Sequence, residues 1–262
     1  TESLKRRQRR MKQMKSRISL LQIVLLLIMI TCFGIFCYEM VWMPYQNQKQ
    51  AEDLKEEFPE EPEESLNDGE SAEKEPEVQA VDLSALREQY PDVRGWLTIP
   101  GTTVDYPVLQ SSEEAPGYYL KRNYQGEWDA NGSLFLQWNC SSEDGPNRII
   151  YGHNMNSGAM FGNLNQYEDA AFWAAHRNVF FQTEKGLEEY TVVSVLKTDI
   201  RKFPFTKVDF PDVASLQEYV ELAKSQEVFE TGENVAECNS VLTLATCAYE
   251  WNGARTVVIA TR

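Results

Sequence analysis

A long apolar run near the start is the first feature of the hydrophobic pattern. Residues 18–38 are 21 residues without a charge, rich in Leu and Ile, and about 20 apolar helical residues cross the hydrocarbon layer of a bilayer. A cleaved signal peptide would end its apolar region in a small-x-small site, which the sequence around Cys37 does not offer. The pattern predicts a retained transmembrane anchor over residues 18–43, with Trp42 placed like an interfacial aromatic residue.

Basic residues stand before this anchor. Residues 1–17 carry eight Lys and Arg side chains and one acid, and basic segments beside a membrane span stay in the cytoplasm. The basic residues are Lys5, Arg6, Arg7, Arg9, Arg10, Lys12, Lys15 and Arg17. We therefore expect a basic cytoplasmic tail at residues 1–17, a single-pass cell-membrane protein, and an extracellular location for the rest of the chain.

Large apolar residues become rare after the anchor. Residues 51–80 hold thirteen acids and two Lys, together with several Pro, and such a composition cannot bury a core. We interpret residues 44–80 as an acidic Pro/Glu-rich spacer that acts as a solvated tether. Its first part, to about Phe58, could continue the membrane helix.

From Val81 onward the pattern is that of a folded domain. Short apolar runs separated by turn residues are typical of strands, and they cover residues 96–99, 104–109, 132–138, 148–151, 190–196, 241–246 and 256–260. Helical patterns cover residues 82–90, with Asp82 as N-cap, and residues 168–177 and 212–226. Many short strands with few helices predict a mainly β domain over residues 81–262, built as a closed barrel decorated by helices.

Composition and charge narrow the function. The hydrophobic fraction of 42% excludes wholesale disorder. Residues 81–262 carry 25 acids against 14 Lys and Arg, a net charge of −11. A domain this acidic repels phosphate backbones, so nucleic acid is an unexpected partner. The sequence holds neither a Gly-rich phosphate loop nor a CxxC pair.

Two histidines are candidates for proton transfer. His153 follows a predicted strand beside Gly152, where the chain turns, and this position favours a functional role over a structural one. His176 lies on a predicted helix next to Arg177, and we interpret it as structural.

Three cysteines lie beyond the anchor, and three cannot all pair within one chain. A bridge between Cys140 and Cys238 would leave Cys247 free, although no pattern establishes that bridge. Cys247 ends a predicted strand in which Leu242 and Leu244 alternate onto the core face. Cys247 shares the other face with Thr243 and Ala245, which we expect to look into a groove. A thiol at such a strand end can act as a nucleophile.

Arg255 follows eight residues after Cys247. The dipeptide Asn252-Gly253 is a strong turn signal, so the flanking strands should form an antiparallel hairpin that brings Arg255 close to Cys247. A guanidinium beside a thiol can lower its pKa or donate to a developing oxyanion. The alternative, which taken alone is the better supported one, is a surface ion pair between Arg255 and Glu250.

Taken together, these residues resemble the sortases, membrane-anchored cysteine transpeptidases of Gram-positive bacteria. The motifs that carry the resemblance run through residues 81–262: 96–102 (WLTIPGT), 105–108 (DYPV), 119–120 (YL), 132–135 (GSLF), 151–155 (YGHNM), 160–164 (MFGNL) and 243–247 (TLATC), with Arg255 in the next strand. The helix at residues 212–226, between the sixth and seventh strands, and the helix before the barrel are similar to those of class B. The resemblance implies an eight-stranded sortase-type β-barrel.

The resemblance also implies roles for residues. Cys247 would be the nucleophile, His153 the general acid and base, and Arg255 the group that stabilises the oxyanion. Four further residues match positions that line the family's signal-binding groove: Leu120, Tyr151, Ala245 and Thr246. Ala245 and Ala248 depart from class B, where Ser and an acid often stand, and both departures bear on signal preference or rate.

The implied substrates are surface proteins or pilins that carry a C-terminal sorting signal. For class B the signal resembles Asn-Pro-x-Thr-Gly/Asn/Ser and is cut after Thr. The resulting thioacyl-enzyme would pass the protein to an amine of the cell wall, on lipid-linked peptidoglycan, or to a pilin lysine. No cofactor or metal is implied, since the calcium site of class A is not carried over.

Two other readings of the chain stay open at this point. One is a secreted cysteine protease that hydrolyses its thioacyl intermediate instead of transferring it. The other is a non-catalytic anchored adhesin that binds partners through its acidic barrel.

Overall fold

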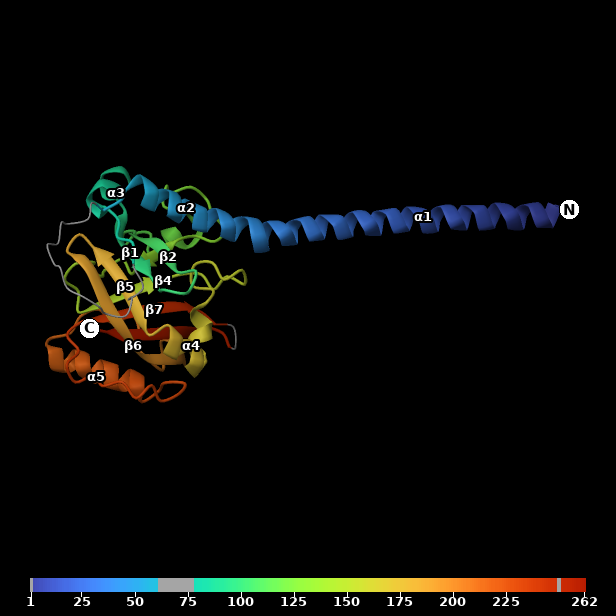
Figure 1. Cartoon of the computed structure of the whole chain (residues 1–262). Coiled ribbons are helices and arrows are strands. Elements are labelled where there is room, and N and C mark those ends of the chain that lie inside the picture. The colour runs from blue at the N-terminus through green and yellow to red at the C-terminus, as the bar shows by residue number, and fades with distance from the viewer. Residues whose placement is uncertain (1, 61–77, 249–250) are drawn as a thin grey trace, which may run out of the picture. The chain divides into compact units, whose positions relative to one another are not determined.

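The computed structural model describes residues 2–60, 78–248 and 251–262, and the chain forms two compact units, Thr1–Tyr45 and Gln46–Arg262. The first unit is helical. Helix α1 (Glu2–Cys37) is followed by a π-helical turn, η1 (Tyr38–Trp42), and by the start of α2 (Met43–Glu57) (Figure 1). The helical stretch Leu20–Glu57 contains an 18-residue window with a mean hydropathy of 2.7, and by length and composition it could cross a membrane. Leu25 and Phe33 of α1 are exposed.

The second unit is a closed β-barrel of eight strands in the order β1-β2-β3-β4-β7-β8-β6-β5 (Figure 1). The strands are β1 (Val93–Thr98), β2 (Asp105–Gln110), β3 (Leu134–Leu136), β4 (Asn147–Tyr151), β5 (Asn178–Thr183), β6 (Gly186–Thr198), β7 (Val241–Cys247) and β8 (Arg255–Thr261). The β2–β3 and β4–β7 pairs are parallel, and the other pairs are antiparallel. The predicted eight-stranded barrel is therefore confirmed.

One strand has no counterpart among the seven runs found in the sequence. Strand β5 pairs with both β1 and β6. Burial alternates only over its first four residues, and its last three residues are all buried, so the alternation that marks a half-exposed strand is too short to stand out.

Polar caps begin the helices around the barrel. Asp82 accepts a hydrogen bond from Ala85 N over 3.0 Å and starts α3 (Leu83–Gln89). Asp212 does the same for α5 (Val213–Lys224), which lies between β6 and β7 as the class B resemblance implies. The helix predicted over residues 168–177 is shorter than expected, because Asp169 caps a separate helix, α4 (Ala170–Ala175). A 3-10 helix, η3 (Leu164–Glu168), precedes α4.

Two hydrophobic clusters hold the barrel together. The first fills its interior, where Leu242, Leu244 and Val258 are completely buried. The second lies on the outer face of β6, β7 and β8 beneath α5, and includes Val257 and Leu216. Each fully buried Val or Leu side chain contributes about 1.5–3 kcal/mol. Strands β7 and β8 are thus covered on both faces, which explains their nearly continuous apolar sequences.

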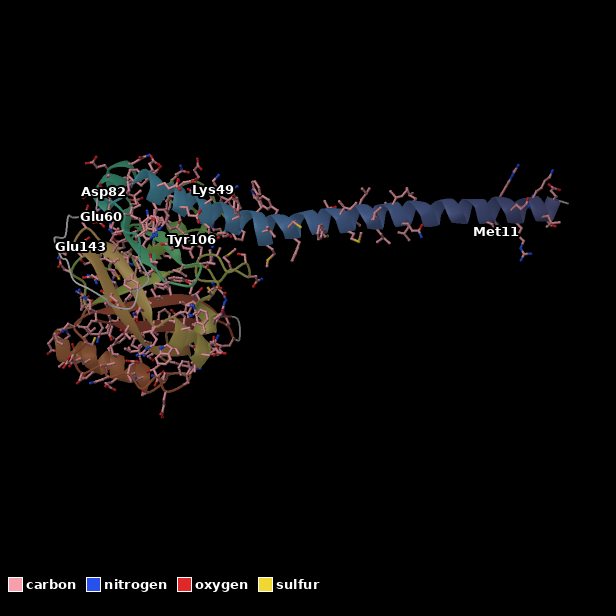
Figure 2. The ribbon with its side chains drawn as sticks, in the orientation of Figure 1. Met11, Lys49, Glu60, Asp82, Tyr106 and Glu143 are labelled. Atoms are coloured by element: carbon pink, nitrogen blue, oxygen red, sulfur yellow. The ribbon has the colours of Figure 1, made fainter. Side chains whose placement is uncertain are left out.

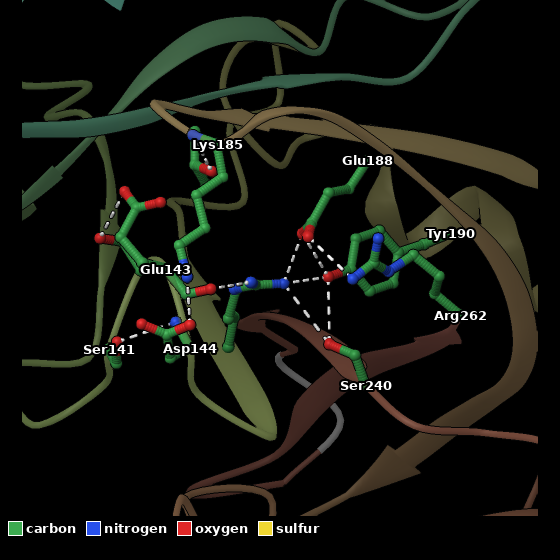
Figure 3. Close-up of polar contacts among 11 residues, drawn as sticks. Ser141, Glu143, Asp144, Lys185, Glu188, Tyr190, Ser240 and Arg262 are labelled. Carbon is green, nitrogen blue, oxygen red and sulfur yellow. Dashed lines mark hydrogen bonds and ion pairs between the residues drawn. The ribbon is translucent and has the colours of Figure 1, made fainter. Parts of the chain in front are cut away.

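Arg148, at the start of β4, is buried in a polar cluster that includes Glu188, Tyr190 and Ser240. Figure 3 shows the contacts of these three partners. Arg148 Nη1 donates to Glu188 Oε2 over 2.6 Å, and Nη2 donates to the carbonyl oxygen of Glu143 over 2.8 Å. Arg262 Nη2 lies 2.9 Å from the other oxygen of Glu188. This cluster belongs to the end of β4 that lies away from His153.

Residues 46–57 continue the N-terminal helix, which is the alternative that the sequence left open, and the prediction of a solvated tether is wrong for residues 46–58. Ala51 and Leu54 of α2 are buried in the first cluster, and Phe58 packs against it. Lys55 Nζ lies 2.7 and 2.6 Å from the two carboxylate oxygens of Asp105. The folded unit begins at Gln46 instead of Val81, because three apolar residues spaced for one helical face outweigh an acidic average composition.

Helix α2 also covers a small cavity of about 30 Å³, lined among others by Asn47, Tyr106 and Met160. Figure 2 labels Tyr106 on β2, together with Lys49 of α2. Burial raises the pKa of Tyr106 to about 12. Residues 61–77 of the predicted spacer lie outside the described residues.

Candidate active site

The two strand pairings of β7 align the predicted catalytic residues. Cys247 is paired directly with Arg255 across the antiparallel β7–β8 ladder, which confirms the predicted hairpin. On the other side, the parallel β4–β7 ladder ends with Tyr151 opposite Ala245. His153 lies two residues beyond Tyr151, and Cys247 lies two residues beyond Ala245. The backbones of His153, Cys247 and Arg255 therefore belong to three neighbouring chain segments at one end of β7.

Side-chain contacts carry the β4–β7 register beyond its last pair. Thr246 Oγ1 donates to the carbonyl oxygen of Gly152 over 2.8 Å. Asn154 Nδ2 donates to the carbonyl oxygen of Cys247 over 2.9 Å. The loop that carries His153 is therefore fastened to the end of β7.

Cys247 is the thiol with access to solvent in the barrel unit. It is half-buried, whereas Cys140 and Cys238 are buried in different hydrophobic clusters, and all five cysteines are free thiols. Burial raises the pKa of both Cys140 and Cys238 to about 11. These two thiols are poor nucleophiles near neutral pH, because only the thiolate attacks.

The face of β7 that Cys247 shares with Thr243 and Ala245 is covered, whereas the sequence predicted that it would look into a groove. Leu242 and Leu244 point into the barrel core, as predicted. Thr243 and Ala245, on the other face, are 0% and 1% exposed, since α5 and the second cluster cover the outside of β7. Cys247 emerges because it lies at the end of the strand, beyond this cover.

His153 is held by a backbone carbonyl. Its Nε2 lies 2.5 Å from the carbonyl oxygen of Leu120 in the 3-10 helix η2 (Tyr118–Lys121). A carbonyl oxygen can only accept a hydrogen bond, so Nε2 is the donor in this contact. Phe161 N donates to the carbonyl oxygen of His153 over 3.0 Å and closes the loop that follows.

Arg255 is half-buried, and its Nη1 donates to the carbonyl oxygen of Ala254 over 2.8 Å. The nearest acid along the neighbouring strand is Asp199, directly after Thr198, the partner of Arg255 on β6. Asp199 accepts hydrogen bonds from Arg201 Nε and Trp251 Nε1, each over 3.1 Å, and those from Arg201 lower its pKa.

Within the described ranges the guanidinium of Arg255 has no carboxylate partner. Glu250, the partner considered from the sequence, lies outside them.

An open cavity of about 450 Å³ is lined by Tyr151, which precedes His153 by two residues in the sequence. The other residues that line it are Pro116, Gln137, Trp138, Asn139 and Thr206. Tyr151 OH donates to Gln137 Oε1 over 2.7 Å, and Gln137 Nε2 donates to the carbonyl oxygen of Thr206 over 2.9 Å. Among these residues sequence reasoning found Tyr151 alone, because the others come from separate loops that share no local pattern.

The remaining groove residues occupy different positions. Leu120 is 40% exposed beside His153. Ala245 and Thr246 are buried, so neither side chain can contact a substrate without rearrangement. Their influence would be exerted through the shape of β7.

His176, the second histidine, lies outside this site. The ring of His176 stacks on Phe172 with centroids 4.1 Å apart, and its Nδ1 lies 2.8 Å from the carbonyl oxygen of Phe172. These contacts agree with a structural role. In the part of the chain that the structure describes, no group of three or more His, Cys, Asp or Glu side chains is arranged to hold a metal ion.

Comparisons with known proteins agree with the fold. The family model described as Sortase domain matches residues 97–262. Sortase B of Listeria monocytogenes is 36% identical over 171 residues, which cover 64% of this chain and 68% of that protein.

Solved structures of other sortase B proteins are similar to the chain. The structure of sortase B from Bacillus anthracis in complex with AAEK1 has a TM-score of 0.65 and 28% identity, covering 84% of this chain and 98% of the other. The Staphylococcus aureus sortase B–substrate complex has a TM-score of 0.62 and 28% identity, with 69% and 83% covered. The chain belongs to the sortase family of cysteine transpeptidases. Within that family it is a class B sortase.

Proposed function

We propose that this class B sortase cleaves an Asn-Pro-x-Thr-Gly/Asn/Ser-like sorting signal after Thr and transfers the protein to an amine of the cell wall. The observation that carries the proposal is the direct pairing of Cys247 with Arg255, with His153 two residues beyond the β4 residue that pairs with Ala245. A thiol between an imidazole and a guanidinium has a nucleophile, a proton carrier and an oxyanion donor within reach of one carbonyl group.

The reaction begins with acylation. His153 takes the thiol proton of Cys247, and the resulting thiolate attacks the carbonyl carbon of the Thr residue. Arg255 donates hydrogen bonds to the negative oxygen that forms. When the tetrahedral intermediate collapses, the C–N bond breaks and His153 gives its proton to the departing amine. The products are a thioacyl-enzyme and the released C-terminal fragment.

The second half-reaction is aminolysis. The incoming amine attacks the thioester carbonyl carbon while His153 removes its proton, and the C–S bond then breaks. A new amide bond joins the signal-bearing protein to the acceptor, and Cys247 is free again. The expected acceptor is an amine on lipid-linked peptidoglycan.

The cavity lined by Tyr151 and Trp138 supports binding of the signal along the outer face of β4. Tyr151 is paired with Ala245, two residues from Cys247, and two extended residues span roughly 7 Å. A peptide whose Thr carbonyl lies at the thiol would therefore reach this cavity with its preceding residues.

The N-terminal helix supports a membrane location. Its hydropathy and length suit a membrane span, and the basic residues before it favour a cytoplasmic N-terminus. The barrel would then lie outside the cell, where surface proteins and cell-wall precursors meet.

The test is a transfer assay with the full chain in detergent. A peptide bearing the signal is incubated with diaminopimelate or glycine as the acceptor amine. We expect ligated peptide from the wild type and none from Cys247→Ala. Cleavage that persists in Cys247→Ala would refute the proposal.

The same assay separates the alternatives. Free acid without ligated peptide would favour a hydrolytic protease over a transpeptidase. A clear preference for a pilin-derived lysine peptide over the cell-wall amine would assign the enzyme to pilus assembly.

A further inference from the structure

We propose that Asn154 is a positioning residue whose side-chain amide holds the Cys247 backbone level with His153. The proposal rests on the function proposed above, because it assigns a role within the same site. Its basis is the hydrogen bond from Asn154 Nδ2 to the carbonyl oxygen of Cys247, 2.9 Å long.

The hydrogen bond from Asn154 joins the two chain segments beyond the point where the backbone pairing of β4 and β7 ends. The last β4–β7 pair is Tyr151 with Ala245, and Thr246 reaches Gly152 through its hydroxyl. Among the hydrogen bonds of the described residues, the Asn154 contact is the one that joins residue 247 to the loop carrying His153. It therefore sets how far the nucleophile lies from its proton carrier along the strand direction.

Asn154 is itself held firmly enough to act in this way. Its backbone forms an isolated antiparallel bridge with Met160, and Phe161 N donates to the carbonyl oxygen of His153 over 3.0 Å. Met160 is buried in the barrel core. The loop is thus closed by its own hydrogen bonds and anchored by the buried Met160. The Asn154 side chain therefore holds the Cys247 backbone at a fixed position relative to the barrel core.

The chemistry of the contact requires an amide of this length. A carbonyl oxygen needs a donor, and an ionised Asp offers none, although its shape is nearly that of Asn. Asn154→Asp removes the donor and places a negative charge against the carbonyl oxygen. Asn154→Gln keeps the donor but adds one methylene group, which displaces either the loop or β7.

The first measurement is steady-state cleavage and transfer of the sorting-signal peptide by the full chain in detergent. We expect kcat to fall about 10- to 100-fold in Asn154→Asp and Asn154→Ala, because small misplacements of reacting groups have effects of that size. KM should stay within about twofold. Asn154→Gln should recover part of the loss relative to Asn154→Ala.

The matched control is Asn156→Asp. Asn156 is exposed on the same loop, and its side chain makes no hydrogen bond to another described residue. The control introduces the same charge two residues away and should keep wild-type kcat. Thermal unfolding verifies that each variant is folded, and Asn154→Ser supplies another removal of the amide if Asn154→Asp does not fold.

A second measurement separates positioning from general support of the fold. The rate of Cys247 alkylation by iodoacetamide is followed against pH with His153 present and in His153→Ala. Asn154→Ala should slow alkylation several-fold at pH 7 and change its pH profile when His153 is present. In His153→Ala the same substitution should change the rate less than twofold, because the partner that Asn154 aligns is gone.

Three results would overturn the inference. They are a kcat for Asn154→Asp equal to that of Asn156→Asp, a kcat for Asn154→Ala equal to wild type, and an alkylation effect of the same size in His153→Ala. Any of them, with Cys247→Ala inactive, leaves the proposed function intact and removes only the role of Asn154.

Discussion

The imidazole Nε2 of His153 lies 2.5 Å from the backbone carbonyl oxygen of Leu120. The two residues come from different loops at one end of the barrel, and the contact fixes which imidazole nitrogen carries a hydrogen. A backbone atom cannot be removed by substitution. The position of the Leu120 carbonyl oxygen can, however, be changed through Gly132, which packs against it.

Gly132→Ala should impair catalysis by moving this carbonyl group. A Cβ atom at residue 132 would lie 2.4 Å from Leu120 O and 2.6 Å from Tyr119 O, and the backbone there has φ +62°. We expect kcat/KM to fall about 10- to 100-fold. Gly232→Ala is the control, since φ is +73° there and nothing lies within 4 Å of the added atom. Equal activities of the two variants would remove Leu120 from the account of the site.

Arg255→Lys should be nearly inactive although the positive charge is kept. An ammonium group lacks the planar fork of a guanidinium and cannot present two N–H donors to one oxyanion. The loss of one such donor lowers kcat about 100- to 1,000-fold. The control is Arg201→Lys on the exposed side of Asp199, which should retain most activity. Near-wild-type kcat for Arg255→Lys would exclude Arg255 from the mechanism.

The cysteines of the barrel unit should differ strongly in reactivity. The pKa of Cys140 and of Cys238 is raised to about 11 by burial, so both are protonated at pH 7.5 and become thiolates only as the pH approaches 11. Peptide mapping after brief treatment with iodoacetamide at pH 7.5 should find the label on Cys247. Comparable labelling of all three would mean that Cys247 has no special accessibility, as the adhesin interpretation requires.

Leu54→Ala should destabilise the barrel unit. Leu54 is 2% exposed in the core cluster, and removing a buried Leu side chain to its Cβ costs about 2–5 kcal/mol. Glu56→Ala, on the exposed side of the same helix, should change the free energy of unfolding by about 0.5 kcal/mol or less. Urea unfolding of the full chain in detergent measures both. Equal stabilities would mean that α2 behaves as a tether after all.

The sequence was most informative where one local pattern sufficed. The Asn252-Gly253 turn and the alternation before Cys247 predicted the hairpin that pairs Cys247 with Arg255. The same alternation also placed Leu242 and Leu244 in the barrel core. In each case the information lay within about ten residues of the chain.

Features that depend on distant partners were missed. The apolar face of α2 was hidden by an acidic average, and its burial requires a barrel built from residues far along the chain. Thr243 and Ala245 could not be recognised as covered, because α5 supplies the cover. Trp138 and Thr206 come together only when two long connections fold over β4.

The most direct test of the account is to identify the atom that carries the substrate during turnover. The full chain in detergent is mixed with a sorting-signal peptide without an acceptor amine, quenched in acid, and analysed by intact and tandem mass spectrometry. We predict an adduct with the mass of the fragment ending in Thr, attached to Cys247, and less of it in His153→Ala and Arg255→Lys. An adduct on another residue, or peptide turnover in Cys247→Ala, would contradict the account.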